Sequence, residues 1–290
     1  MGPTGTGKSS FINSATGNSV KVGHDLESCT TEIGIIKCQF PERCGLDVVF
    51  VDTPGFDDTN KSDLEILEMV ANWLKVTYER KIVLAGILYL HRISDNRMAG
   101  TPLKNLRMFE KLCGHDALKN IVLVTTMWDE IEDDGEEDVG SQREAELVEK
   151  FWKPMISQGS KHVRYHNTTD SAWNIIDDFL KEANERHAVL LQDEMVSMEM
   201  ELRETRAGRQ LFDTLDGLVK KQQNTIKSIR KVKTNQSDDV TMQSLNEEYE
   251  KTQRLLEDTL KDMRKLKIPI GKRVLRLLST QLGLVGKRIQ

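Results

Sequence analysis

The sequence contains 290 residues, 38% of them hydrophobic and 30% charged, with a formal net charge of −5 at pH 7. That length accommodates one α/β domain plus an appendage, and the acidic balance argues against a polyanionic partner such as nucleic acid for the chain as a whole. No apolar run reaches the roughly 18 residues that a membrane-spanning helix requires. The four cysteines lack metal-ligand spacing and the N-terminus resembles no secretory signal, so we expect a cytoplasmic location.

A phosphate-binding loop opens the chain. The residues after Met1 read GPTGTGKS and fit the pattern G-x-x-x-x-G-K-[ST] at every fixed position. Backbone N–H groups of such a loop surround two phosphates, and its glycines avoid clashes with the phosphate oxygens. Lys8 is expected to reach the β- and γ-phosphates as a catalytic residue, and Ser9 to bind Mg²⁺. The nucleotide-binding residues predicted in this stretch are Gly2, Thr4, Gly5, Thr6, Gly7, Lys8, Ser9 and Ser10.

Such a loop normally follows a buried strand in the centre of a parallel sheet, yet only Met1 precedes Gly2 here. Either the sequence is truncated or another segment fills that position. The loss of a central strand leaves ladder groups unpaired on both of its neighbours, so we expect a domain that folds poorly or binds nucleotide weakly.

The remaining elements alternate between helices and strands. The sequence predicts, in order, a helix over residues 9–15, a polar loop over 17–31, strands at 33–38 and 46–51, a helix over 64–76, a strand at 84–90, a helix over 102–113 and a strand at 120–124. This alternation is typical of the α/β class. We expect a doubly wound, mostly parallel sheet with its ligands at the carboxyl ends of the strands, as in a P-loop NTPase or G domain.

A second phosphate motif follows the second of these strands. Asp52-Thr53-Pro54-Gly55 places a carboxylate at a strand end and a glycine in the turn after it. Asp52 is therefore expected to hold Mg²⁺ through water, while the N–H of Gly55 meets the γ-phosphate. Alone, this pattern is a common turn, but its position one hairpin after the first motif makes it specific.

The stretch Thr126-Met127-Trp128-Asp129 bears on the choice of nucleotide. It matches the guanine-recognition pattern [NT]-K-x-D, except that Met127 replaces the lysine. A carboxylate at position 129 accepts hydrogen bonds from two N–H donors of guanine that adenine lacks, and such a contact contributes about 1.5–3 kcal/mol. Met127 keeps the packing of a long side chain but supplies no donor. The alternative is that Asp129 merely begins the acidic run that ends at Asp138.

Four stretches together resemble a known group of proteins: GKSSFIN (7–13), VDTPGFDDT (51–59), ILYLHRISDNRMAG (87–100) and VLVTTMWDE (122–130). Over about Gly2 to Leu180 the chain resembles the fungal G-domain proteins allied to the septin and GIMAP (immunity-associated) GTPases. The resemblance implies a GTP-binding αβα domain that uses GTP or GDP with Mg²⁺. It also implies switch regions around residues 29–31 and 52–60.

The same resemblance assigns roles to residues outside these motifs. It implies that Thr30 is the switch hydroxyl, a catalytic residue and a Mg²⁺ ligand, with Thr31 as the alternative. The segment VRYHN (163–167) resembles the one that packs on guanine in the GIMAP group. His166 or Asn167 is therefore expected to touch the base, unless the pair only forms a turn.

Hydrolysis is expected to be slow. Phe56 stands beside Gly55, where many small GTPases have a glutamine that orients the attacking water. Without that group or an arginine finger, a factor of about 10³–10⁵ in rate is missing. The septin and GIMAP resemblance suggests that a partner across the nucleotide completes the site. His91 and Arg92 are candidate donors across such an interface, although a capped strand end is the favoured interpretation.

The chain changes character near His187, so we predict a G domain over 1–186 and a helical coiled-coil extension with a basic tail over 187–290. Two narrow apolar stripes run from Leu191 to Thr205 and from Met242 to Leu266, separated by a basic linker and a polar hinge at 234–239. The helices either fold back as an antiparallel pair or mediate dimerisation. Beyond Pro269 the basic tail either docks as a last helix, which is favoured, or lies on an anionic membrane.

Two functions follow from these features. One is a GTPase that acts as a switch or assembly module, binds GTP and forms a homodimer through the G domain or the coiled coil. The other is a scaffold whose degenerate G domain binds nucleotide weakly while the helices make the assembly. The motif residues favour the switch, whereas Phe56, Met127 and the missing strand favour the scaffold. A P-loop ATPase is the remaining alternative.

Overall fold

The structure, a computed structural model, describes residues 1–17, 32–39, 47–58, 61–98, 100–133, 137–181, 187–234 and 239–265. The chain divides into two compact units, Met1–Ala207 and Gly208–Gln290. This division differs from the one expected near residue 187. The segment after residue 187 stays with the first unit because Gln192 is fully buried there, and its side-chain amide donates to the carbonyl of Leu74 (3.3 Å).

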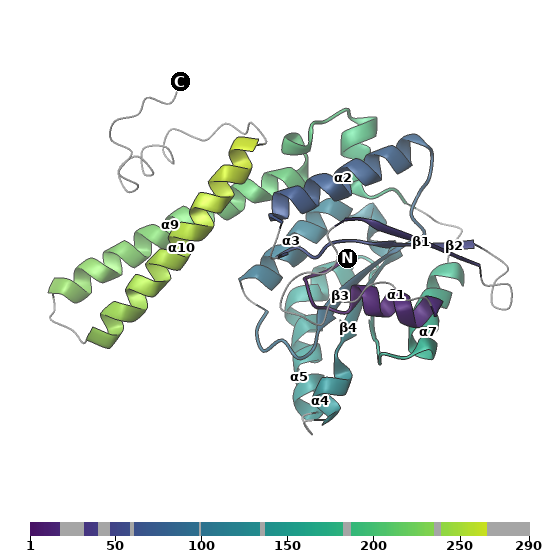
Figure 1. Cartoon of the computed structure of the whole chain (residues 1–290), viewed down its shortest axis with the longest axis horizontal. Helices are drawn as coiled ribbons and strands as arrows, with labels where there is room; N and C mark the ends of the chain where they lie inside the picture. Colours follow the sequence, from purple (N-terminus) through teal and green to yellow (C-terminus); the bar gives the residue numbers. More distant parts are fainter. Residues whose placement is uncertain are drawn as a thin grey trace. The chain divides into compact units, whose positions relative to one another are not determined.

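Among its described residues, the first unit contains five strands in two sheets (Figure 1). β1 (Gly34–Gln39) and β2 (Asp47–Asp52) form an antiparallel pair in which Gly34 lies opposite Asp52. β3 (Ile87–Arg92), β4 (Ile121–Thr126) and β5 (Lys161–Arg164) form a parallel sheet in that order. The expected parallel α/β arrangement is confirmed for β3 to β5. No hydrogen-bonded ladder among the described residues joins β2 to β3.

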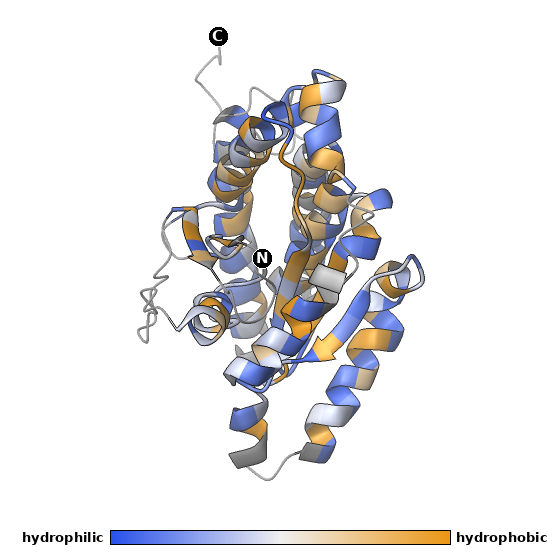
Figure 2. Cartoon of the chain, turned by 90° about the vertical axis from the view of Figure 1, so that its right-hand side faces the viewer, coloured by the Kyte–Doolittle hydropathy of each residue, from blue (hydrophilic) through white to orange (hydrophobic). Residues whose placement is uncertain are grey.

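Helices cover both faces of the parallel sheet. On one face, α1 (Lys8–Thr16) and α7 (Thr169–Lys181) pack side by side over β3 and β4 (Figure 1). Their core contains Phe11, Leu90, Val124 and Trp173, and the indole N–H of Trp173 donates to the carbonyl of Ala15 (3.0 Å). On the opposite face lie α2 (Asp63–Glu79) and α3 (Thr101–Cys113). Figure 2 shows hydrophobic residues gathered along the central strands.

Local sequence signals explain where several helices begin and end. Ser62 and Glu65 form a capping box that starts α2, since each side chain bonds the other residue's backbone N–H. Pro102 lies in the first turn of α3, where a missing N–H costs nothing. The helix stops at Gly114, whose φ is 71° and where a Cβ would lie 2.5 Å from the Cβ of Leu190. The expected boundaries of α3 are confirmed.

Shorter elements complete the first unit. They are a 3-10 turn at Asp116–Asn120, α4 (Trp128–Asp133), α5 (Glu137–Glu146), a π-helical segment at Leu147–Trp152, α6 (Lys153–Ile156), α8 (Leu190–Gln192), a π-helical turn at Asp193–Ser197 and a 3-10 turn at Leu202–Glu204. The last three replace the continuous seam helix expected over 191–205. That expectation is wrong because the segment wraps onto the G domain, where Leu191 and Gln192 are buried.

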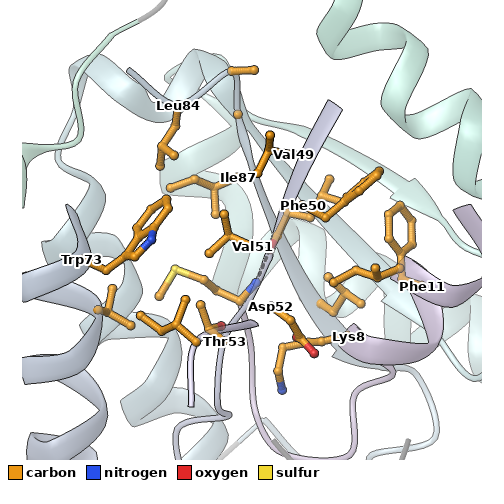
Figure 3. A pocket seen from close by; sticks show the side chains of 18 of the residues that line it. Lys8, Phe11, Val49, Phe50, Val51, Asp52, Thr53, Trp73, Leu84 and Ile87 are labelled. Carbon is orange, nitrogen blue, oxygen red and sulfur yellow. Dashed lines mark hydrogen bonds between the residues drawn. The ribbon is translucent and has the colours of Figure 1, made fainter. Parts of the chain in front are cut away.

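A gap separates β2 from β3, and Met1 lies at one end of it. The amino group of Met1 donates to the carbonyl of Leu88 (2.6 Å), and the N–H of Leu90 donates to the carbonyl of Met1 (2.9 Å). Met1 thus takes the place of a residue in a strand parallel to β3. A largely apolar cavity of about 220 Å³ extends beside it, and its lining includes Val51 and Ile87 (Figure 3).

The gap changes the environment of β2. Its sequence reads as a buried strand, but Val48, Phe50 and Val51 are only half-buried and Val49 is 51% exposed. β2 is hydrogen-bonded to β1 along one edge, and its other edge borders the cavity.

The second unit is built from α9 and α10. α9 (Arg206–Thr234) begins at the end of the first unit, and α10 (Asp239–Lys265) follows residues 235–238. An ion pair between Lys221 and Glu248 (3.0 Å) links the two helices. The expected helix of the second stripe is confirmed as α10, whereas most of the predicted basic linker forms α9.

The buried positions of this unit include the apolar Val219, Leu256 and Leu260 and several polar side chains: Gln210, Gln222, Thr225, Thr252 and Thr259. A coiled coil therefore stays a prediction. The basic tail lies outside the described residues. Within the described part of the chain, no helix combines the length and apolarity needed to cross a membrane.

Candidate phosphate- and base-binding site

The phosphate-binding loop leads directly into α1. Gly7 is the residue before the helix, with a φ of 80°, and the helix begins at Lys8. Thr6 is fully buried, and its hydroxyl donates to the carbonyl of Pro3 (2.9 Å), which closes the loop on itself. The first N–H groups of a helix have no partner within the helix. The loop and the start of α1 therefore form an anion-binding environment.

Two glycines are required where the loop meets its neighbours. A Cβ on Gly2 would lie 2.3 Å from the carbonyl oxygen of Leu90 in β3, and the φ of Gly2 is 139°. A Cβ on Gly55 would lie 2.5 Å from the backbone nitrogen of Thr4. Both positions exclude any larger residue because the opposing atoms belong to the backbone. Gly2 thus fixes the loop on β3, and Gly55 brings the second phosphate motif against it.

Lys8 folds back over the loop. Its amino group donates to the carbonyls of Pro3 (2.7 Å) and Gly2 (3.1 Å). Burial lowers the pKa of Lys8 to about 8, and the negative charges of Asp52, Asp57 and Asp58 oppose that decrease. The amino group is therefore held close to the loop.

The two predicted metal ligands that the structure describes lie together. The hydroxyl of Ser9 donates to one carboxylate oxygen of Asp52 (2.6 Å). The other oxygen of Asp52 and the hydroxyl of Thr53 are buried and have no hydrogen-bond partner among the described residues. Oxygen donors of this kind suit Mg²⁺, which retains several waters and accepts hydroxyl and carboxylate ligands.

The segment after Asp52 is anchored to the loop and to α3. Pro3 and Phe56 form a parallel bridge, and the side-chain amide of Asn105 donates to the carbonyl of Phe56 (3.3 Å). The phenyl ring of Phe56 is 1% exposed. The N–H of Thr4 donates to the carboxylate of Asp57 (2.9 Å). This segment therefore lies directly against the mouth of the phosphate-binding loop.

At the base end, Thr126 connects β4 to the loop. Its hydroxyl lies within hydrogen-bond distance of the carbonyls of Thr6 (3.1 Å) and His91 (3.3 Å). The Met127 methyl group lies 3.6 Å from the position of a Cβ on Gly7, so Met127 packs over the loop. Asp129, in the first turn of α4, is exposed. The turn after β4 thus places the exposed carboxylate of Asp129 at the same edge of the sheet as the phosphate-binding loop.

A network that the motifs did not reveal holds this turn. Glu144 of α5 is buried and accepts hydrogen bonds from Arg164 (2.8 and 2.5 Å) and from the hydroxyl of Thr125 (3.1 Å). The guanidinium of Arg164 also stacks 4.0 Å above the ring of Trp128, whose indole N–H donates to the Thr125 hydroxyl (3.0 Å). Motif analysis did not find this cluster because its residues are far apart in the sequence, with a separation of 39 positions between Thr125 and Arg164.

The residues after β5 lie near the same turn. His166 and Asn167 are exposed, and the rings of His166 and Trp128 are 6.4 Å apart. The hydroxyl of Tyr165 donates to Ser14 in α1 (2.8 Å), which ties the segment to the phosphate-binding side. Asn167 has a φ of 54°, as in the turn that the sequence allowed as the alternative. Contact of His166 or Asn167 with a nucleotide base therefore stays a prediction.

The structure therefore gathers most of the predicted site at the carboxyl ends of β3, β4 and β5. The loop, the Ser9–Asp52 pair, Gly55, Thr126 and Asp129 belong to this arrangement, and Ser10 lies in the first turn of α1. Thr30 and its alternative Thr31 lie outside the described residues. Their assigned roles stay predictions.

A comparison with known proteins identifies the family. The sequence profile of the AIG1 family matches residues 1–260. The chain belongs to the AIG1 family. It is therefore a GIMAP-type P-loop GTPase by descent, and its family binds GTP. The GIMAP part of the expected resemblance is confirmed, whereas its fungal and septin parts stay predictions. The match also covers α9 and most of α10.

Solved structures support the fold of this AIG1-family chain. Two structures of Toc33 from Arabidopsis thaliana match, one of a dimerization-deficient mutant and one of the complex with GDP and Mg²⁺. Each has a TM-score of 0.50 at 18% identity, over 65% of this chain and 84% of the Toc33 chain. A structure reported with the finding that dimerization is important for the GTPase activity of atToc33 and psToc159 has a TM-score of 0.50 at 17% identity, over 65% and 83%. No curated protein matches the chain.

Proposed function

We propose that this AIG1-family protein binds GTP and GDP with Mg²⁺ and hydrolyses GTP slowly, as a switch or assembly module. The proposal rests on the position of two groups at one edge of the sheet. The Ser9–Asp52 pair lies beside the phosphate-binding loop, and the hydrogen bond from Thr126 to Thr6 holds the turn with Asp129 against that loop. Ser9 and Asp52 would hold Mg²⁺, which neutralises phosphate charge when bound. Asp129 would select guanine.

Slow hydrolysis follows from the environment of Phe56. Its ring is buried, so neither its chemistry nor its position allows it to orient a water molecule. We propose that a second copy supplies the missing group when two G domains pair. Of the two candidate donors, His91 is 2% exposed and cannot reach a partner, whereas the side chain of Arg92 is 39% exposed. For Toc33 itself, dimerization is described as important for GTPase activity.

A non-enzymatic scaffold is the second candidate. The cavity between β2 and β3 favours it, because no ladder among the described residues joins these two strands beside the phosphate-binding loop. Met127 favours it as well, since a thioether cannot replace the hydrogen bonds of a lysine. The two candidates differ in nucleotide affinity, which is directly measurable.

Titration with fluorescent GDP, GTP and ATP analogues in Mg²⁺ tests the proposal. The protein should bind both guanine nucleotides and discriminate against ATP. Lys8→Ala should abolish binding, because Lys8 is the cation of the loop, whereas Lys111→Ala, at an exposed position on α3, should leave it unchanged. Circular dichroism verifies that each variant folds. A folded protein that binds no nucleotide supports the scaffold, and a preference for ATP supports an ATPase.

A further inference from the structure

The carboxylate of Asp57 occupies the mouth of the phosphate-binding loop. It accepts a hydrogen bond from the N–H of Thr4, one of the loop's own backbone donors, at 2.9 Å. Asp57 has a φ of 70°, in the left-handed region that non-glycine residues seldom adopt. A backbone group that could meet a phosphate is therefore already bound to an anion of the same chain.

The charges around Asp57 are those of a phosphate site. Lys8 and Arg92 both act on its carboxylate, and Arg92 reaches the loop, with a guanidinium nitrogen 3.3 Å from the position of a Cβ on Gly5. Burial raises the pKa of Asp57 and the negative charge of Asp63 adds to that increase, whereas the Thr4 N–H and both cations oppose it. The Asp57 carboxylate therefore lies against the Thr4 N–H and is attracted by Lys8 and Arg92.

The position of Asp57 indicates which phosphate it would displace. Gly55, the residue expected to meet the γ-phosphate, abuts Thr4, since a Cβ on Gly55 would lie 2.5 Å from the Thr4 nitrogen. Thr4 therefore lies at the γ-phosphate end of the loop. We propose that the Asp57 carboxylate takes the place of the terminal phosphate of GTP, so that GTP must displace Asp57 and GDP need not. This inference rests on the proposed function.

Displacement of Asp57 would break contacts that connect it to α2 and α3. The N–H of Asp57 donates to the carboxylate of Asp63 at the start of α2 (3.0 Å), and the other oxygen of Asp63 pairs with Lys104 of α3 (2.5 Å). Asn105 of α3 also bonds the carbonyl of Phe56. Hydrogen bonds and an ion pair therefore connect Asp57 and its neighbour Phe56 to α2 and α3.

Asp57→Asn tests the inference, because asparagine has the same shape and tolerates the left-handed conformation. Affinities for fluorescent GDP and for a non-hydrolysable GTP analogue are measured in Mg²⁺. The variant should bind the GTP analogue about tenfold more tightly, because the amide oxygen of asparagine accepts from the Thr4 N–H without the negative charge that strengthens this competing hydrogen bond. Its affinity for GDP should change by less than about twofold. Glu79→Gln, at the exposed end of α2, is the matched control for net charge and should change neither affinity.

A second measurement needs no nucleotide. Hydrogen exchange of the Thr4 amide should be slow in the nucleotide-free protein and faster in Asp57→Gly, which lacks the acceptor and tolerates the left-handed conformation, with Glu79→Gln as the control. Equal exchange in both proteins overturns the inference, and so does an equal gain in affinity for GDP and GTP. Slow exchange of Thr4 without nucleotide binding by any variant means that the proposed function fails and that GTP discrimination fails with it, although the contact is real.

Discussion

Replacement of Glu144 by alanine should weaken the first unit more than any charge change on its surface. Glu144 is 9% exposed, and its carboxylate accepts two hydrogen bonds from Arg164 and one from Thr125. Hydrogen bonds to charged groups contribute about 1.5–3 kcal/mol to stability. The side chain of Arg164 is 40% exposed, so water can solvate its guanidinium once the carboxylate is gone. We therefore expect a loss of about 2–3 kcal/mol in the free energy of unfolding rather than the larger cost of a fully buried orphan charge.

Glu146→Ala is the matched control. It lies on the same helix, carries the same charge and also pairs with a cation, Lys150 (2.8 Å), but its side chain is 53% exposed. An exposed ion pair of this type contributes at most about 0.5 kcal/mol. The two variants thus differ mainly in the burial and connectivity of the lost carboxylate.

Urea unfolding followed by tryptophan fluorescence measures the difference. The four tryptophans of the chain all lie in the first unit, so their emission reports that unit. With a urea m-value of about 2.5 kcal/mol/M, the midpoint should fall by about 1 M for Glu144→Ala and by less than about 0.2 M for Glu146→Ala. Equal midpoints for the two variants would refute the reasoning, because the network around Trp128 would then contribute nothing to stability.

Three further predictions concern the site. Asp129→Asn should weaken GDP binding about 10- to 100-fold by removing a charged acceptor, while ADP binding stays unchanged; a parallel loss for both nucleotides contradicts guanine selection. Burial lowers the pKa of His91, so its contribution to stability should be complete above about pH 6.5 and decrease as the pH falls below that value. Urea midpoints at pH 7.5 and 5.5 should differ less in His91→Leu than in the parent, and an unchanged difference rules out His91 as the cause. Gly55→Ala should reduce nucleotide affinity more than about tenfold in a protein with an unaltered circular dichroism spectrum, because its Cβ meets the backbone of Thr4 at 2.5 Å; unaltered affinity means that this contact is not needed for binding.

Much of the first unit could be predicted because its signals are local. The phosphate-binding motif from Gly2 to Ser9 is complete within eight consecutive residues, and α3 carries both its start and its stop in Pro102 and Gly114. The boundaries of the strands were less exact. The strand expected at 84–90 begins at Ile87, since apolar Leu84 lines the cavity instead of pairing with β4.

The elements that sequence reasoning missed depend on distant contacts. Residues 190–204 have the spacing of a seam helix, but burial of Leu191 and Gln192 on the first unit breaks them into short turns. The basic character of residues 206–234 conceals the regular helix α9. Helical periodicity specifies only that one face is apolar, and it does not specify which surface that face will meet.

The site shows the same division. The motifs at Asp52 and Thr126 could be located because each begins at the last residue of a strand, and the binding roles of their residues stay predictions. The roles of Asp57 and Glu144 were not predicted, since Asp57 meets a loop 53 residues away and Glu144 meets Arg164 across 20 residues. No short pattern encodes such contacts, and only the folded sheet edge assembles them.

The cavity beside Met1 shares one of its walls with the phosphate-binding loop, because Lys8 and Asp52 close it at one end (Figure 3). Burial of Lys8 beside this largely apolar cavity lowers the pKa of its amino group to about 8, close to neutral pH. Water that entered the cavity behind Lys8 would favour its charged form and thus strengthen anion binding. Apolar side chains packed there would instead favour the neutral amine.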